Sequence, residues 1–459
     1  MSGWFARLGV VAATTRETRV LADHETLTPA ELAAYQRRRF GAMLRHAATH
    51  SSYYRERLAG IDLEQDVDPA SVPTLDKATM LDHFDAIVTD PRLRLTELEQ
   101  HVQSSASEGL HLAEYRVMAT GGTSGKRGIF VYGQRDWIET LAGLMRFNQY
   151  YVGASIRLPN RRRVAAVAAK SQIHMTARMS ASLDVGAHRL LRLDARTPLP
   201  ALVAALNAFR PEVLIAYASV AALLAEEQLD GRLAIAPEMV ATTSEVRTAE
   251  MSGRIRAAWG HALFDCYAST ETGILAGECE RHTGLHVFSD QTLLEVMDES
   301  GRPVPPGVEG HYLLVTNLVN RTQPLIRYQL TDRVTMLKEP CPCGRPFPLL
   351  AAVDGRSDDL LKLRGRDGGV VTVHPLAIRS PLATLPGLRE YRVVLDRDGL
   401  TIEAVLAFGG ESDAARIPAL LGAALDQCGV ASPPVRVRPV AEIARNPISG
   451  KKKLVESRL

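Results

Sequence analysis

Short apolar runs alternate with helical patterns through the middle of the chain, and this alternation constrains the fold more than any other feature. Three runs have the length and composition of strands: RVAAVAA (163–169), PEVLIAYA (211–218) and HYLLVTNLV (311–319). Between them, ALVAALNAF (201–209) and VAALLAEEQL (220–229) have helical spacing. Strands that alternate with helices favour a parallel sheet with crossover helices, so the sequence predicts an α/β fold.

The two ends of the chain have different patterns. Residues 27–58 mix apolar and basic residues at helical spacing, which predicts one helix. Near the other end, residues 389–408 contain two strand-like runs around an Asp-Gly turn, and a helix is expected from about Ala414 to Leu425. We therefore predict a large α/β N-terminal domain, residues 1–354, and a small α+β C-terminal domain, residues 355–459.

Composition excludes several classes of function. The 459 residues are 46% hydrophobic and carry a formal charge of +2, which gives no overall field for nucleic acid or an anionic membrane surface. No run reaches the roughly 18 apolar residues of a membrane span. Five cysteines are too few, and odd in number, for a disulfide framework, so reduced thiols or a metal site are expected. These features favour a cytoplasmic protein.

A glycine-rich stretch, ATGGTSGKRG (119–128), has the composition of a phosphate-binding loop. Glycine lets backbone amides approach an anion, and hydroxyls and a lysine add donors. It departs from the P-loop of NTPases, because Thr120 replaces the first glycine and Arg127 follows Lys126 where Ser or Thr would bind magnesium. By itself the stretch is equally compatible with an ordinary turn.

Seven stretches, in order, resemble the motifs of the adenylate-forming superfamily. They are ATGGTSGKRG, TTSEV (242–246), YASTETG (267–273), GVEGHYLLVTNL (307–318), RYQLTDR (327–333), DGRSDDLLKLRG (354–365) and NPISGKKK (446–453). HAATHSSYYRERL (46–58) and RYQLTDR resemble the phenylacetate-CoA ligase branch in particular. The resemblance spans essentially the whole chain. It implies a mobile small domain and two half-reactions, in which a carboxylate and ATP give an acyl-adenylate and a thiol then takes the acyl group.

The resemblance assigns phosphate contacts to the glycine-rich loop and to YASTETG. In the second motif, Thr270 is expected to contact the α-phosphate and Glu271 to bind Mg²⁺, a hard cation that takes oxygen ligands. The alternative is that residues 269–272 only cap a helix. The residues expected to hold the β- and γ-phosphates are Thr120, Thr123, Ser124, Gly125 and Lys126.

The nucleoside contacts also follow from the resemblance. Asp332 is expected to accept hydrogen bonds from the ribose hydroxyls, and Arg356 to make a second ribose or phosphate contact. A surface ion pair is the alternative for each. The residues expected around the adenine and along the nucleotide are Ser244, Glu245, Tyr267, Ala268 and Ser269.

Lys451 in NPISGKKK resembles a lysine that enters the site during adenylation, and Asp358 resembles the hinge of the small domain. The alternative for Lys451 is a frayed basic terminus. The chain also departs from the family pattern: Arg127 replaces a proline, Gly121 a serine, and Asn446-Pro447 a lysine and a threonine.

Cys341-Pro-Cys343 and Cys279 offer three thiols, and His282 or His286 a nitrogen, for a tetrahedral zinc site. Some members of the ligase branch carry such a cluster, and the resemblance of the GLH segment favours His286. Buried cysteines and unrelated surface histidines are the alternative.

The resemblance places the acid pocket in segments around 171–175 and 216–219. The residues expected to line it are Tyr132, His174, Ala216, Tyr217 and Thr243. An aryl or arylacetic acid, ATP, Mg²⁺ and CoA are the substrates and cofactors that the resemblance implies for an acyl-CoA ligase. Related ligases are often dimers, so a homodimer is expected. Transfer to an amine or a carrier-protein thiol is an alternative. The third interpretation is a non-catalytic nucleotide-binding protein. The chain argues against it by retaining Lys126, Glu271, Asp332, Arg356 and Lys451.

Overall fold

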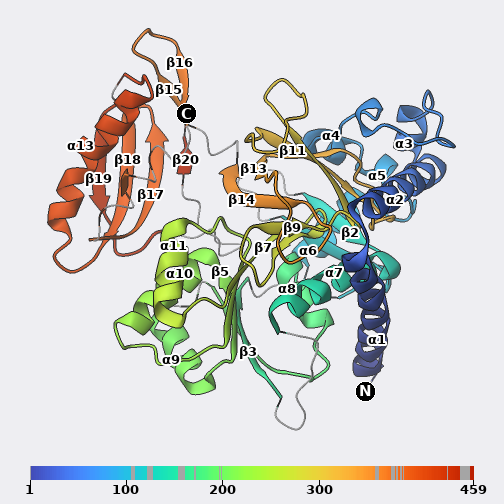
Figure 1. Cartoon of the computed structure of the whole chain (residues 1–459), viewed down its shortest axis with the longest axis horizontal. Helices are drawn as coiled ribbons and strands as arrows, with labels where there is room; N and C mark the ends of the chain where they lie inside the picture. Colours follow the sequence, from blue (N-terminus) through green and yellow to red (C-terminus); the bar gives the residue numbers. More distant parts are fainter. Residues whose placement is uncertain are drawn as a thin grey trace. The chain divides into compact units, whose positions relative to one another are not determined.

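The computed structural model contains two compact units, residues 1–354 and 355–459, and each is described by itself (Figure 1). The structure describes residues 2–104, 109–120, 128–152, 161–169, 172–195, 197, 199–356, 361–373, 378, 381–382, 385, 387–431, 433–444 and 455–458.

A nine-stranded sheet organises the first unit, with the order β13-β14-β9-β8-β7-β6-β5-β3-β4. From β4 to β7 the neighbouring strands are parallel, whereas β7, β8, β9 and β14 pair antiparallel. The predicted α/β fold is confirmed. The strands are β3 (Arg163–Ala168), β4 (Arg189–Asp194), β5 (Val213–Tyr217), β6 (Met239–Thr243), β7 (Leu263–Ser269), β8 (Gly273–Glu278), β9 (Leu285–Val287), β13 (Asp332–Met336) and β14 (Leu349–Arg356).

Helices accompany the parallel half of the sheet and bury its apolar side chains. Leu206 of α9, Leu224 of α10 and Ala165 of β3 are fully buried in one hydrophobic cluster. Small alanines in β3 and α10 allow this close helix–sheet packing. The helices are α8 (Met175–Ser182), α9 (Leu199–Phe209), α10 (Ala218–Leu229) and α11 (Ala249–Trp259).

The apolar run at 311–319 lies outside the parallel sheet, which corrects one expectation. It forms β11 (Tyr312–Asn317), the middle strand of a three-stranded sheet with β10 (Thr292–Met297) and β12 (Tyr328–Leu330). Both neighbours are antiparallel to β11. An apolar run alone cannot distinguish the two directions, and here loops rather than crossover helices connect the strands.

The helix expected over residues 27–58 is two helices, because Ser51 interrupts it. A capping box between Thr28 and Glu31 begins α2 (Pro29–His50). The Ser51 hydroxyl accepts a hydrogen bond from the Tyr54 N–H at 3.3 Å and thereby begins α3 (Ser52–Arg57). The other N-terminal helices are α1 (Ser2–Asp23), α4 (Lys77–Asp82), α5 (Phe84–Ile87) and α6 (Leu95–Gln103), with short 3₁₀ turns at His24–Thr26 and Pro69–Ser71.

A buried hairpin, β1 (Arg116–Ala119) and β2 (Ile129–Tyr132), precedes α7 (Gln134–Val152). Among the helices that the structure describes, none has the length and apolarity needed to cross a membrane.

The second unit has the predicted α+β composition. Residues 388–406 form an antiparallel pair around the expected turn, and the helix expected over 414–425 is α13 (Glu411–Gln427). Gly399 in the turn has φ +121°, a conformation that favours glycine. The strands are β15 (Leu361–Arg364), β16 (Val370–Val373), β17 (Leu388–Asp396), β18 (Gly399–Leu406), β19 (Val435–Pro439) and β20 (Val455–Ser457), of which the last four form one sheet, β19-β18-β17-β20.

Candidate active site and candidate metal centre

The parallel strands β5, β6 and β7 end at the same edge of the large sheet, and most of the predicted binding residues lie at this edge. Tyr217 of β5 pairs in register with Thr243 of β6, which in turn pairs with Cys266 of β7. In open α/β sheets, ligands bind beyond the carboxyl ends of the strands. The predicted residues brought to this edge are Ala216, Tyr217, Thr243, Ser244, Glu245, Tyr267, Ala268, Ser269, Thr270 and Glu271.

Hydrogen bonds tie neighbouring strand ends together at this edge. The Ser219 N–H, in the first turn of α10, donates to the Glu245 carboxylate at 2.9 Å. A carboxylate is stabilised at a helix N-terminus by the helix dipole. The Ala169 N–H, directly after β3, donates to the Tyr217 hydroxyl at 2.9 Å. The segments predicted to surround adenine and acid are therefore joined by polar contacts.

Residues 269–272 form the turn between β7 and β8, which are antiparallel. The Ser269 hydroxyl accepts a hydrogen bond from the Thr272 N–H at 3.2 Å and lies 2.9 Å from the Thr272 hydroxyl. Gly273 follows with φ +81°. A strand follows this turn, so the alternative that these residues cap a helix is wrong.

Two buried side chains donate to successive carbonyl groups of this turn. The Tyr132 hydroxyl donates to the Thr270 carbonyl at 2.9 Å, and the Asn317 amide donates to the Glu271 carbonyl at 3.0 Å. Burial, with the Glu271 and Asp136 carboxylates as smaller causes, raises the pKa of Tyr132 well above its usual value. Tyr132 is fully buried. It therefore supports the turn, and its place in the acid pocket stays a prediction.

The glycine-rich stretch joins the two strands of the β1–β2 hairpin. The Thr120 N–H donates to the Gly128 carbonyl at 3.0 Å, and the Gly128 N–H donates to the Thr120 hydroxyl at 2.9 Å. This reciprocal pair closes the base of the loop. A P-loop leads from a strand into a helix, so the hairpin agrees with the sequence departures. Thr123, Ser124, Gly125 and Lys126 lie outside the described residues, as do Gly121 and Arg127.

The other predicted site residues are spread over both units. Asp332 begins β13 and is buried, and His174 directly precedes α8 and is half-buried. Arg356 ends β14, and the structure describes its backbone alone. Asp358 and Lys451 lie outside the described residues, so their roles as hinge and catalytic lysine stay predictions.

The predicted metal ligands Cys279, His286, Cys341 and Cys343 form one cluster, in which all four ligand atoms lie within 4.8 Å of one another. The Sγ atoms of Cys279 and Cys341 are 3.7 Å apart, and Cys343 Sγ lies 3.4 Å from His286 Nε2. A zinc tetrahedron with bonds of about 2.0–2.3 Å has edges of roughly 3.3–3.8 Å. The donor set and its spacing therefore fit zinc.

The surroundings of the cluster distinguish the two candidate histidines. His282 Nδ1 lies 3.2 Å from the Glu278 carboxylate, while the buried His286 faces Cys343. Burial and the nearby Arg345 lower the pKa of His286 to about 4, so its imidazole is neutral, the form that binds metals. Burial raises the pKa of Cys279 to about 12. A metal ion would overcome this penalty, because it binds the thiolate.

Sequence reasoning did not identify the buried amides that support the site. Asn317, Asn320 and Gln323 are spaced three residues apart, and the first of them is the last residue of β11. Asn317 lies within the quoted motif GVEGHYLLVTNL, and the repeated amides after an apolar strand were an available signal.

Comparisons with known proteins concern the sequence and the fold as a whole. No protein-family model matches the chain. The chain is 26% identical over 403 residues to a phenylacetate-coenzyme A ligase of Thermus thermophilus, covering 83% of this chain and 82% of that protein. It is 26% identical over 394 residues to the phenylacetate-coenzyme A ligase of Aromatoleum evansii, covering 80% and 79%.

Solved structures show the same fold. A crystal structure of 2-hydroxyisobutyryl-CoA ligase in the postadenylation state matches with a TM-score of 0.72 and 22% identity, covering 95% of this chain and 91% of that one. The chain is therefore similar in sequence to phenylacetate-CoA ligases over about 80% of its length, and it shares the fold of an acyl-CoA ligase of known structure.

Proposed function

We propose that this protein is an AMP-forming acid–CoA ligase. A carboxylate oxygen attacks the α-phosphorus of ATP, the bond to pyrophosphate breaks, and an acyl-adenylate forms. The CoA thiolate then attacks the acyl carbon and AMP leaves with its electron pair. The observation that carries this proposal is the YASTETG turn at the carboxyl edge of the parallel strands, where Thr270 and Glu271 follow β7.

The chain's own residues would stabilise the negative charge that builds up as the carboxylate approaches the triphosphate. Lys126 and the hydroxyls of the glycine-rich loop are proposed to hold the β- and γ-phosphates, and Asp332 to accept the ribose hydroxyls. Glu271 is partly exposed on a turn with a fixed backbone, so its carboxylate fits a Mg²⁺ ligand. Bound there, Mg²⁺ would neutralise phosphate charge.

We further propose that zinc occupies the cluster of Cys279, His286, Cys341 and Cys343 as a structural metal. Its four N and S donors leave no open position for a substrate, which is typical of structural zinc sites. Metal analysis of the purified protein is expected to give about one zinc per chain. A content far below one would contradict the assignment.

An aryl or arylacetic acid is the proposed substrate, supported by the two phenylacetate-coenzyme A ligases among the relatives. None of the five cysteines, all of which the structure describes, forms a disulfide, which supports the reducing cytoplasm as the compartment. A homodimer is part of the same proposal.

The test is acid-dependent pyrophosphate release across a panel of carboxylates, with and without CoA. A ligase gives acyl-CoA with an aryl or arylacetic acid. Pyrophosphate release without acyl-CoA would favour transfer to an amine or a carrier-protein thiol. Inactivity across the panel would favour a non-catalytic nucleotide-binding protein.

Lys451→Ala tests the proposed lysine, with Lys452→Ala as the matched control. Adenylate formation is expected to fall by about 10²–10³-fold, while thiol transfer from preformed acyl-adenylate is largely kept. Equal loss of both half-reactions would contradict the role.

A further inference from the structure

The segment Asn317–Gln323 connects the two parts of the chain on which the proposed phosphate chemistry depends. Its three amide side chains, Asn317, Asn320 and Gln323, are at most 1% exposed. Buried amides need hydrogen-bond partners, and these three find theirs on other segments as well as within their own loop.

One set of partners lies on β2, the strand that follows the glycine-rich loop. Gln323 accepts from the Val131 N–H at 2.9 Å and donates to the Ile129 carbonyl at 3.2 Å. Asn320 donates to the Val131 carbonyl at 2.9 Å. Among the strands that the structure describes, β2 pairs with β1 alone, so these side chains satisfy its second edge as a neighbouring strand would.

The other partner is the turn that carries Glu271. The Asn317 oxygen accepts from the N–H groups of Val319 and Asn320, both at 2.9 Å. Two N–H donors on one side fix the orientation of the amide, so its NH₂ group must face the Glu271 carbonyl. Asn317 therefore ties the turn to the same segment that holds the hairpin.

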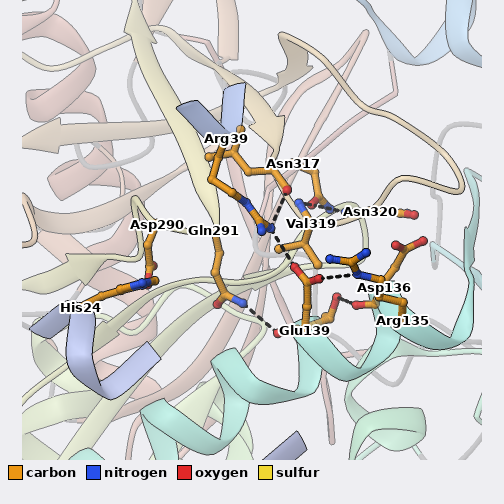
Figure 2. A network of polar contacts seen from close by, with 12 residues as sticks. His24, Arg39, Arg135, Asp136, Glu139, Asp290, Gln291, Asn317, Val319 and Asn320 are labelled. Atoms are coloured by element: carbon orange, nitrogen blue, oxygen red, sulfur yellow. Dashed lines mark hydrogen bonds and ion pairs between the residues drawn. The ribbon is translucent and has the colours of Figure 1, made fainter. Parts of the chain in front are cut away.

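The segment is itself held in place by charged groups. Thr322 donates to Asp136 through its hydroxyl at 2.6 Å and its N–H at 3.0 Å. Arg39 donates to the Leu318 carbonyl at 2.9 Å and pairs with Glu139 at 2.7 Å. Figure 2 shows Arg39 and Arg135 on either side of Glu139, near Asn317 and Val319. Partners on α2 and α7 thus restrain the loop.

We propose that Asn317 is a positioning residue that acts through Glu271. By holding the Glu271 carbonyl, it orients the carboxylate toward the metal–phosphate position, and the rest of the segment holds β2, the strand after the glycine-rich loop, in a fixed place relative to the turn. The inference rests on the proposed function, in which both segments contact one ATP. A catalytic group must be held to within about 0.5 Å of its productive position, and supporting hydrogen bonds such as that of Asn317 provide this restraint.

The test measures ATP affinity with and without Mg²⁺, for the wild type and Asn317→Ser. In the wild type, Mg²⁺ strengthens binding. In Asn317→Ser that gain is expected to fall by about tenfold, as for the loss of other groups that orient a metal ligand, while affinity without Mg²⁺ changes less than about twofold. Asn317→Asp is the second variant, because it removes the donor and keeps the acceptor for Val319 and Asn320.

Asn207→Ser is the matched control. The Asn207 side chain also donates to a carbonyl, of Arg232 at 3.1 Å, and accepts from an N–H, of Ala234 at 2.7 Å, but it lies on α9. The gain in ATP affinity that Mg²⁺ gives to Asn207→Ser is expected to match the gain in the wild type.

The double variant Asn317→Ser/Glu271→Gln tests whether Asn317 acts through Glu271. Its Mg²⁺-dependent gain is expected to equal that of Glu271→Gln within about twofold, since coupled residues are not additive. Additive losses, or equal losses with and without Mg²⁺, would overturn the inference and indicate a general structural role. A wild type that does not bind ATP would overturn the proposed function as well. A wild type that binds, with an unchanged Asn317→Ser, would overturn the inference alone.

Discussion

The Cys/His cluster and the Ser269–Gly273 turn, the proposed metal and phosphate sites, both depend on contacts between distant segments, but they are built in opposite ways. In the cluster, four side chains direct their donor atoms toward one another, and three of the four are fully buried or nearly so. In the turn, the backbone carbonyls of Thr270 and Glu271 are held by Tyr132 and Asn317, and the Glu271 side chain stays partly exposed.

This difference fits the two roles proposed for them, a structural metal site for the cluster and a substrate site for the turn. A structural site completes its ligand set within the protein and excludes other molecules. A site for a substrate must be held through the backbone, so that its side chains remain available to bind what arrives. Damage to the first is therefore expected to appear in stability, and damage to the second in activity.

The largest effect is expected when the cluster loses a ligand. Cys341→Ser should lose the bound zinc and lower the free energy of unfolding by about 4 kcal/mol or more, because loss of a metal is among the most destabilising changes. Urea unfolding and metal analysis measure the two effects.

The matched control is Cys266→Ser, another buried cysteine, which lies outside the cluster on β7. It should keep its zinc. If Cys341→Ser kept its zinc and its stability, Cys341 would not be a zinc ligand and the assignment of the cluster would be wrong.

Glu271→Gln is expected to lower activity and to leave stability nearly unchanged. Adenylate formation should fall by about 10²–10³-fold, or roughly 3–4 kcal/mol of activation free energy, because a charged group at the phosphates is lost. The thermal unfolding temperature should stay within about 2 °C of the wild type, since the carboxylate is partly exposed. A large loss of stability would show that the turn is built like the cluster.

A pH effect is expected from the buried ion pair behind the cluster. Arg146 binds Asp290 at 2.6 Å and packs over Phe288 and Phe347. Burial alone would raise the pKa of Asp290, but Arg146 and His24 lower it to about 2. Because the folded-state pKa is depressed, the stabilisation is complete above about pH 4 and is lost as the pH falls toward 2, by about 2 kcal/mol.

Unfolding free energies between pH 5 and 3 test this expectation. Asp290→Asn is expected to be less stable at every pH, because Arg146 loses its charged partner. The comparison with the wild type therefore uses the slope of the unfolding free energy against pH. The variant should have the flatter slope, and equal slopes would rule out Asp290 as the source.

The smallest effect is expected for Tyr132→Phe, which removes the donor to the Thr270 carbonyl and keeps the ring. Stability should fall by about 1 kcal/mol, the net value of one hydrogen bond. Adenylate formation should fall by less than about tenfold, since Asn317 still holds the turn. Tyr53→Phe serves as a control, because the Tyr53 hydroxyl neither donates nor accepts a hydrogen bond among the described residues.

Local patterns predicted those elements whose signal lies within a few residues. The strands at 163–169 and 211–218 and the helices at 201–209 and 220–229 form where periodicity and strand propensity indicated them. The break at Ser51 was missed because a hydroxyl cap is a single-residue signal within a continuous helical pattern.

Sequence motifs also selected the four cluster residues, because ligand chemistry restricts the residue types to Cys and His. The choice between His282 and His286 from the residues alone stayed open. The structure separates the two, since His282 faces Glu278 and His286 faces Cys343.

The sequence by itself determined the α/β class and predicted the kind of chemistry and the residues proposed to carry it, because these depend on local periodicity and on side-chain functional groups. Only the tertiary structure decided that Asn317 supports Glu271, 46 positions away, and that Gln323 completes the edge of β2, 192 positions from its partner Val131. A buried amide has the same local signature wherever it lies, and its partner is set by the packing of the whole unit.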